Sequence, residues 1–98
     1  MAEMICVFCG RYTRTKHHLI FGMSLRALSD EDKLTIPLCD EHHNMAVKAI
    51  DRIHGNPTAE KLSKMLGQAI WERNKIASGI AESEVRELFI KRYGRSYL

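Results

Sequence analysis

The sequence predicts a small α+β domain in which short strands and turns come first and helices follow. Three observations lead to this class. All three cysteines and four of the five histidines lie between positions 6 and 43. Two β-like segments, 13–21 and 33–38, fall within that part of the chain. From position 39 onwards, apolar residues recur at intervals of three and four, which is typical of helices that bury one face.

The expected elements follow from these patterns and from the residues that end them. One helical turn is expected over 24–28, between the two strands, and a helix over 39–54 after the second strand. Thr58 is a suitable N-cap for a third helix that runs to position 78, and Gly94 ends the last one. Trp71 lies off the apolar stripe of the third helix, and we expect it to pack on another element rather than face a partner. That stripe comprises Leu62, Met65, Leu66, Ala69, Ile70, Ile76 and Ala77.

Length and composition bound the protein class. With 98 residues we expect one domain, 1–98, with a core over 5–55 and a helical extension over 57–98 packed on it. Hydrophobic residues make up 45% of the chain, as in folded globular proteins. No apolar run is long enough to span a membrane and no signal-peptide pattern opens the chain, so no membrane partner is expected. An odd number of cysteines with metal-type spacing favours the reducing cytoplasm over a disulfide framework.

Basic charge is unevenly distributed, although the net charge is only +3. No acidic residue occurs from Met4 to Ser29. Clustered cations beside a metal site suit a polyphosphate such as DNA, while a solvated basic surface is the simpler alternative. The residues expected to contact nucleic acid are Arg11, Arg14, Lys16 and Arg26. A second basic group lies near the C-terminus, where Tyr93 and Tyr97 either touch DNA or pack as a tail.

Two Cys-x-x-Cys/His pairs indicate a structural zinc site. Cys6 and Cys9 form the first pair, and Cys39 and His42 form the second. Two intervening residues let a tight turn aim both side chains at one ion, and four such ligands suit tetrahedral zinc. Redox chemistry or plain buried thiols are the alternatives, but a thioredoxin-like site needs a βαβ context that is missing here.

On a helix over 39–54, His42 and His43 would point in different directions. Successive helical residues are rotated by about 100°. His42 would therefore close the zinc site beside Cys39, and His43 would reach a second site.

The order Cys-x-x-Cys, His-His, Cys-x-x-His-His resembles the HNH endonucleases, the ββα-metal or His-Me finger family, in their zinc-bearing treble-clef form. The segment 33–44, with Pro-Leu-Cys-x-x-His-His, is similar to small HNH proteins of phages and prophages. The resemblance covers residues 5 to about 55. It implies a short β-hairpin and a helix around the zinc, and a metal-dependent nuclease that hydrolyses DNA to 5′-phosphate and 3′-hydroxyl ends.

The resemblance also implies residue roles. His17 and His43 would hold a divalent cation such as Mg²⁺ or Mn²⁺, and His18 would be the general base. The chain departs from the family in two places. His42 stands where many relatives have Cys, and 33–38 lacks the Asn that orients the base, a role left to a backbone carbonyl or to Asn44.

Two other functions remain compatible with the sequence. One is a catalytically silent zinc module that binds nucleic acid through the same basic surface. The other is a structural phage protein in which zinc only holds the fold. The expected partner is DNA, with a phage packaging or replication protein as a further candidate, in the cytoplasm of a bacterial or phage-infected cell.

Overall fold

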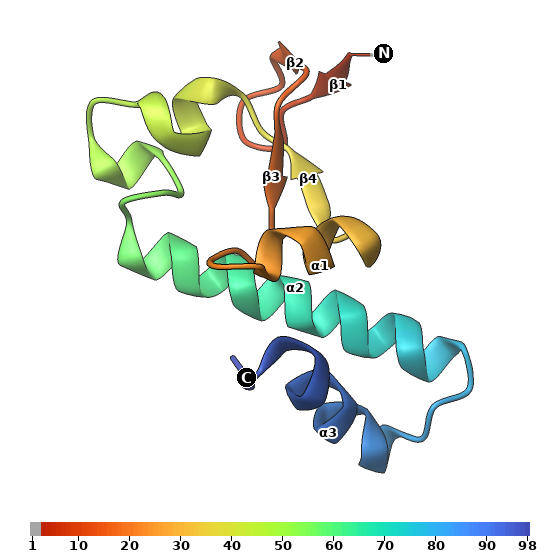
Figure 1. The fold of residues 1–98 in the computed structure, drawn as a ribbon. Coiled ribbons are helices and arrows are strands. Elements are labelled where there is room, and N and C mark those ends of the chain that lie inside the picture. The colour runs from red at the N-terminus through yellow and green to blue at the C-terminus, as the bar shows by residue number, and fades with distance from the viewer. Residues whose placement is uncertain (1–2) are drawn as a thin grey trace.

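The computed structural model describes residues 3–98. Two short hairpins and a metal-ligand-rich turn form one end of the molecule, and two long helices form the other (Figure 1). The predicted α+β class is therefore confirmed. In chain order the elements are β1 (Met4–Ile5), β2 (Tyr12–Thr13), β3 (Lys16–His18), α1 (Leu25–Glu31), β4 (Thr35–Pro37), η1 (Glu41–Met45), η2 (Ala49–Asp51), α2 (Pro57–Ala77) and α3 (Glu82–Tyr93).

The second hairpin carries the paired histidines. β3 and β4 are antiparallel, with His17 opposite Ile36 and His18 opposite Thr35. Because side chains alternate across a strand, the two histidines point to opposite faces. His17 is fully buried against α2, whereas His18 faces α1. The long strand expected over 13–21 is split at Thr13, whose hydroxyl accepts the backbone N–H of Thr15 at 3.0 Å.

The prediction of one continuous helix over 39–54 is wrong. The chain instead forms a π-helical turn, η1 (Glu41–Met45), and a 3-10 turn, η2 (Ala49–Asp51). Two of the apolar residues that suggested the helix, Met45 and Ile50, are 71% and 81% exposed. The spacing of these apolar residues therefore does not indicate a buried helical face.

A polar clamp explains why this segment reverses instead of continuing as a helix. The backbone becomes extended at Ala46, and the chain returns so that the His54 N–H donates to the His43 carbonyl at 3.0 Å. Arg52 donates to the carbonyls of Ala46 at 2.6 Å and of His54 at 2.8 Å. Its guanidinium lies 2.9 Å from where a Cβ on Gly55 would stand, so the clamp needs a glycine there. Hydrogen bonds to these backbone groups therefore decide the conformation of this segment, which the apolar periodicity did not predict.

Helix α2 begins two residues earlier than a Thr58 cap would place it, because the Asn56 side chain accepts the Ala59 N–H at 3.2 Å. The expected apolar stripe is also wrong, since Leu62 and Leu66 are 58% and 46% exposed. The buried face comprises Ser63, Gly67, Gln68 and Trp71. Small residues let the helix approach the end of β3 closely.

Helix α3 completes the core on the other side of α2. Trp71 packs edge-on against Phe89, with ring centroids 5.3 Å apart, as expected for a packed tryptophan. Asp32, just after α1, accepts from the Arg92 guanidinium at 2.7 Å and from the Tyr93 hydroxyl at 2.6 Å. Gly94 ends the helix with φ of 92°, as predicted. The cluster comprises Leu19, Ile20, Leu34, Trp71, Val85, Phe89 and Tyr93. Over residues 3–98, no helix has the length and apolar character needed to cross a membrane.

Candidate functional site

Three cysteines form the first candidate metal group. The sulfurs of Cys6, Cys9 and Cys39 all lie within 4.8 Å of one another. Those of Cys9 and Cys39 are 3.7 Å apart, too far for a disulfide. Zn–S bonds of about 2.3 Å in a tetrahedron require sulfurs about 3.8 Å apart. The thiol geometry therefore fits zinc.

Backbone donors surround the Cys6 sulfur. The Phe8 N–H donates to it at 3.4 Å. Burial raises the pKa of the Cys6 thiol, but N–H groups of Cys39, Cys9 and Phe8 outweigh it and lower this pKa to about 6. A thiolate stabilised by backbone amides is the form in which cysteine binds metal. The Cys6 sulfur is thus prepared to bind a metal, whereas burial raises the pKa of the Cys39 thiol.

His42 is not part of the compact cysteine group. Its Nδ1 lies 2.7 Å from the Asp51 carbonyl, which can only accept, so Nδ1 carries the hydrogen. Its Nε2 is then free of a proton in the neutral ring, and the ring packs on Phe8 with centroids 5.5 Å apart. Histidines that bind metal commonly donate their other N–H to a carbonyl in this way. The tautomer suits a fourth ligand.

Three histidines form a second candidate metal group. Ring nitrogens of His17, His43 and His54 lie within 4.8 Å of one another, and the closest pair of rings, His43 and His54, has centroids 4.6 Å apart. His54 was not among the residues expected from the sequence. The clamp by Arg52 turns the chain back and brings His54 beside His43.

The hydrogen bonds of His17 identify its tautomer. The Ser63 hydroxyl donates its single hydrogen to the Leu19 carbonyl at 2.7 Å, so its oxygen accepts from His17 Nε2, also at 2.7 Å. The buried Nδ1 has no hydrogen-bond partner within residues 3–98. Burial, followed by the nearby His54 and His43, lowers the pKa of His17 to about 3. His17 is thus held neutral with an unused lone pair.

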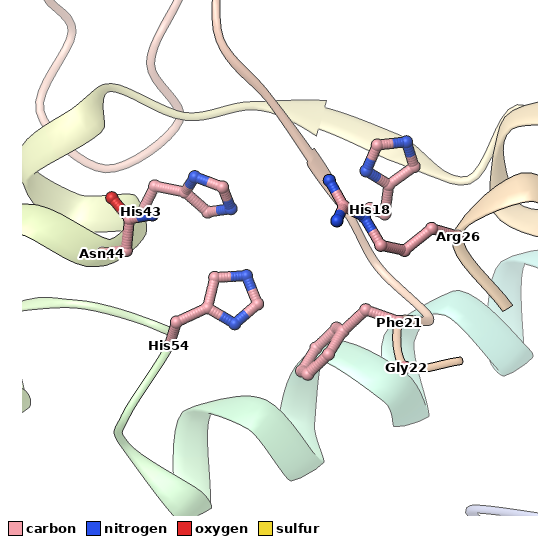
Figure 2. A pocket seen from close by; sticks show the side chains of 7 residues that line it. All are labelled: His18, Phe21, Gly22, Arg26, His43, Asn44 and His54. Carbon is pink, nitrogen blue, oxygen red and sulfur yellow. The ribbon is translucent and has the colours of Figure 1, made fainter. Parts of the chain in front are cut away.

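The other two histidines of the group have different surroundings. Burial lowers the pKa of His43. The Glu60 carboxylate lies 3.6 Å from His54 Nδ1. The other ring nitrogen, Nε2, faces His43 (Figure 2). Phe21 covers one side, with its ring 4.7 Å from that of His54. Three imidazole rings around one point are a ligand set suited to a divalent metal.

A cavity of about 380 Å³ opens beside the histidine group, lined by His18, Phe21, Gly22, Arg26, His43, Asn44 and His54. In Figure 2, His43 and His54 stand on one side, and His18 and Arg26 on the other. His18 Nε2 lies 2.9 Å from an oxygen of Asp30. An ionised carboxylate only accepts, so Nε2 carries the hydrogen, and in the neutral ring Nδ1 has the lone pair.

The structure separates the four basic residues expected to contact nucleic acid. Arg26 lines the cavity. Arg11 pairs with Glu41 at 2.6 Å, and Arg14 lies 3.8 Å from Glu3. Lys16 is exposed. Arg26 is therefore the one of the four placed beside the histidines.

Comparison with known proteins adds one relationship. No curated protein and no solved structure matches the chain. One family model matches residues 1–71, which include both candidate metal groups and most of α2. The chain therefore belongs to the family described as protein of unknown function (DUF968).

Proposed function

We propose that this protein is a metal-dependent endonuclease of the HNH type that hydrolyses DNA phosphodiester bonds. One observation carries the proposal: the buried, neutral His17 presents an unused Nδ1 beside His43 and His54, and these two histidines line a cavity together with His18. A core histidine would normally have both nitrogens satisfied. The unsatisfied nitrogen is accounted for if the group binds a metal.

In this proposal His17, His43 and His54 hold one divalent cation. When bound, such a cation stabilises the negative charge that develops on the phosphate and on the leaving oxygen. Ser63 fixes the His17 ring and its tautomer from behind, and Glu60 supports His54. Arg26 supplies a fixed positive charge for a non-bridging phosphate oxygen.

His18 is the general base, and we assign Asp30 as the residue that positions it. Asp30 binds Nε2, so Nδ1 is free to accept a proton from the attacking water. The hydroxide oxygen bonds to phosphorus, the bond to the 3′ oxygen breaks, and that oxygen takes a proton from solvent. Asp30 would then do the work of the orienting Asn that the segment 33–38 lacks.

The cysteine group is structural in this proposal, with His42 as the fourth zinc ligand. His42 already has the required tautomer, and a rotation of its ring would have to bring Nε2 to the sulfurs. The zinc would join the first hairpin to η1, the element that carries His43.

A plasmid assay tests the proposal. Purified zinc-loaded protein should nick or cut supercoiled DNA only with Mg²⁺ or Mn²⁺, and DNA ligase should reseal the nicks, because it joins 5′-phosphate to 3′-hydroxyl. His18→Ala should slow cleavage by about a hundred- to ten-thousand-fold. Asp30→Asn, which keeps an acceptor, should retain more activity than Asp30→Ala. Glu31→Gln, an exposed neighbour, is the control.

Folded protein that cuts no DNA with any divalent cation would contradict the nuclease assignment. DNA binding without cleavage would then favour the silent binding module. If His54→Ala left Mn²⁺ binding unchanged, the histidine group would not be the cation site.

A further inference from the structure

A second hollow lies beside the histidine cavity, between the start of α2 and the C-terminal segment. Its volume is about 550 Å³. The residues that line it are Pro57, Glu60, Lys61, Lys64, Arg95, Ser96, Tyr97 and Leu98. Lys61, Lys64 and Arg95 make no ion pair with any carboxylate among residues 3–98. Their charges are therefore available to an anion.

The acidic side chain in the lining, Glu60, has partners other than these cations. The Glu60 carboxylate accepts the Gly55 N–H at 3.3 Å and lies 3.6 Å from His54 Nδ1. Its Oε2 atom is thus engaged by a backbone N–H beside His54. Elsewhere on the surface, by contrast, Arg11, Arg86 and Arg92 are each paired with a carboxylate within 3 Å.

Aromatic rings connect the hollow to the histidine cavity. The Lys64 ammonium lies 4.6 Å from the centre of the Phe21 ring and 5.7 Å from that of Tyr97. The Arg95 guanidinium lies 5.3 Å from the Tyr97 ring. Phe21 also lines the histidine cavity, so a strand leaving that cavity past Phe21 would meet Lys64 first. Cations over ring faces beside an open groove suit a nucleic-acid strand.

A buried polar residue fixes the tail that forms one wall. Gln68 is fully buried in α2, and its Oε1 accepts the Tyr97 N–H at 2.6 Å. Its Nε2 donates to the Ser96 hydroxyl at 2.9 Å. A buried amide is stabilising only when its bonds are made, so the tail is held in one place. Arg95 and Tyr97 are therefore positioned in advance, not by the ligand.

We propose that this hollow is a second phosphate-binding subsite, which holds the DNA backbone next to the phosphate that is cut. Lys64 and Arg95 bind phosphate oxygens, with Lys61 at the rim. This inference rests on the proposed nuclease, which places the phosphate that is cut in the histidine cavity. DNA binding to the subsite can be measured without any cleavage.

Binding of a fluorescent DNA duplex, measured by anisotropy without added Mg²⁺ or Mn²⁺, tests the subsite. Each lost phosphate contact should reduce the slope of the logarithm of the DNA-binding constant against the logarithm of the salt concentration by about 0.9. At 0.1 M salt this change corresponds to binding that is about eightfold weaker. Lys64→Gln and Arg95→Gln should each show this loss on several DNA sequences, whereas Lys64→Arg should not.

The matched control is Lys75→Gln. Lys75 lies on α2 and also sits over an aromatic ring, 5.4 Å from the centre of Trp71. It lies eleven positions after Lys64, about 17 Å along the helix. It should bind DNA like the wild type. Gln68→Leu, which removes the tail anchor, should weaken binding if it folds.

Unchanged slopes in both Lys64→Gln and Arg95→Gln, or an equal loss in Lys75→Gln, would overturn the subsite. Plasmid cleavage with unchanged slopes would reject the subsite alone. Reduced slopes in a protein that never cleaves DNA would retain the subsite and reject the nuclease. A slope loss seen only with RNA would identify a different polymer and overturn the proposal for DNA.

Discussion

Acidification should destabilise this protein through one buried histidine. His17 has its pKa lowered to about 3 in the folded state, against 6.5 for the exposed ring. Between these two pKa values the His17 ring is protonated in the unfolded chain and neutral in the folded chain. The free energy of unfolding therefore falls as the pH falls below about 7. From pH 7 to pH 5 the linkage amounts to about 2 kcal/mol, because one pKa unit corresponds to about 1.4 kcal/mol.

Urea unfolding of wild type and His17→Phe, at pH 7 and pH 5, measures this difference. Phenylalanine fills a similar volume, cannot titrate, and leaves the Ser63 hydroxyl bonded to the Leu19 carbonyl. Wild type should lose about 2 kcal/mol more than the variant over this range. The measurement uses zinc-loaded protein without other divalent cations, so that loss of zinc affects both chains alike. Parallel changes in both proteins would refute the assignment of His17 as a buried neutral base.

Three further outcomes are expected. Cys39→Ser should release zinc and unfold much of the chain, as shown by elemental analysis and circular dichroism, because metal affinity at such a site is folding energy. Gly67→Ala should gain about 1 kcal/mol of helix propensity but cost about 1–3 kcal/mol of overpacking. The new Cβ would stand 2.7 Å from Cγ1 of Ile20, which is fully buried, so we expect a net lowering of Tm. Arg26→Gln should slow cleavage more than Arg11→Gln, since Arg26 lines the histidine cavity while Arg11 pairs with Glu41.

Spacing along the chain was enough to predict the cysteine group. Cys6 and Cys9 lie on one tight turn, in which the Gly10 N–H donates to the Cys6 carbonyl at 3.0 Å, and this turn brings their sulfurs close. His17 and His43, to which the family resemblance assigns one cation, lie in one group, while cation binding by this group stays a prediction. The place of His54 could not be predicted in this way, because it depends on hydrogen bonds that Arg52 makes to distant carbonyls.

The face of α2 that packs was misjudged for a different physical reason. Apolar periodicity counts side chains that gain by burial, which favoured Leu62 and Leu66. The helix instead packs where its side chains are smallest, at Ser63 and Gly67. Close approach of backbone to Leu19 and the hydrogen bonds of Ser63 then decide the rotation of the helix. A pattern of hydrophobicity contains no information on such contacts.

The two candidate metal groups share one short peptide. Cys39 and His43 are four residues apart, and the His43 N–H donates to the Cys39 carbonyl at 2.9 Å. A change at the sulfurs would therefore be passed to the imidazoles through a single turn. Hydrogen peroxide, which oxidises thiolates and spares neutral imidazole rings, would therefore act on His43 through this turn. Any chemistry performed by the histidines would in this way depend on the redox state of its surroundings.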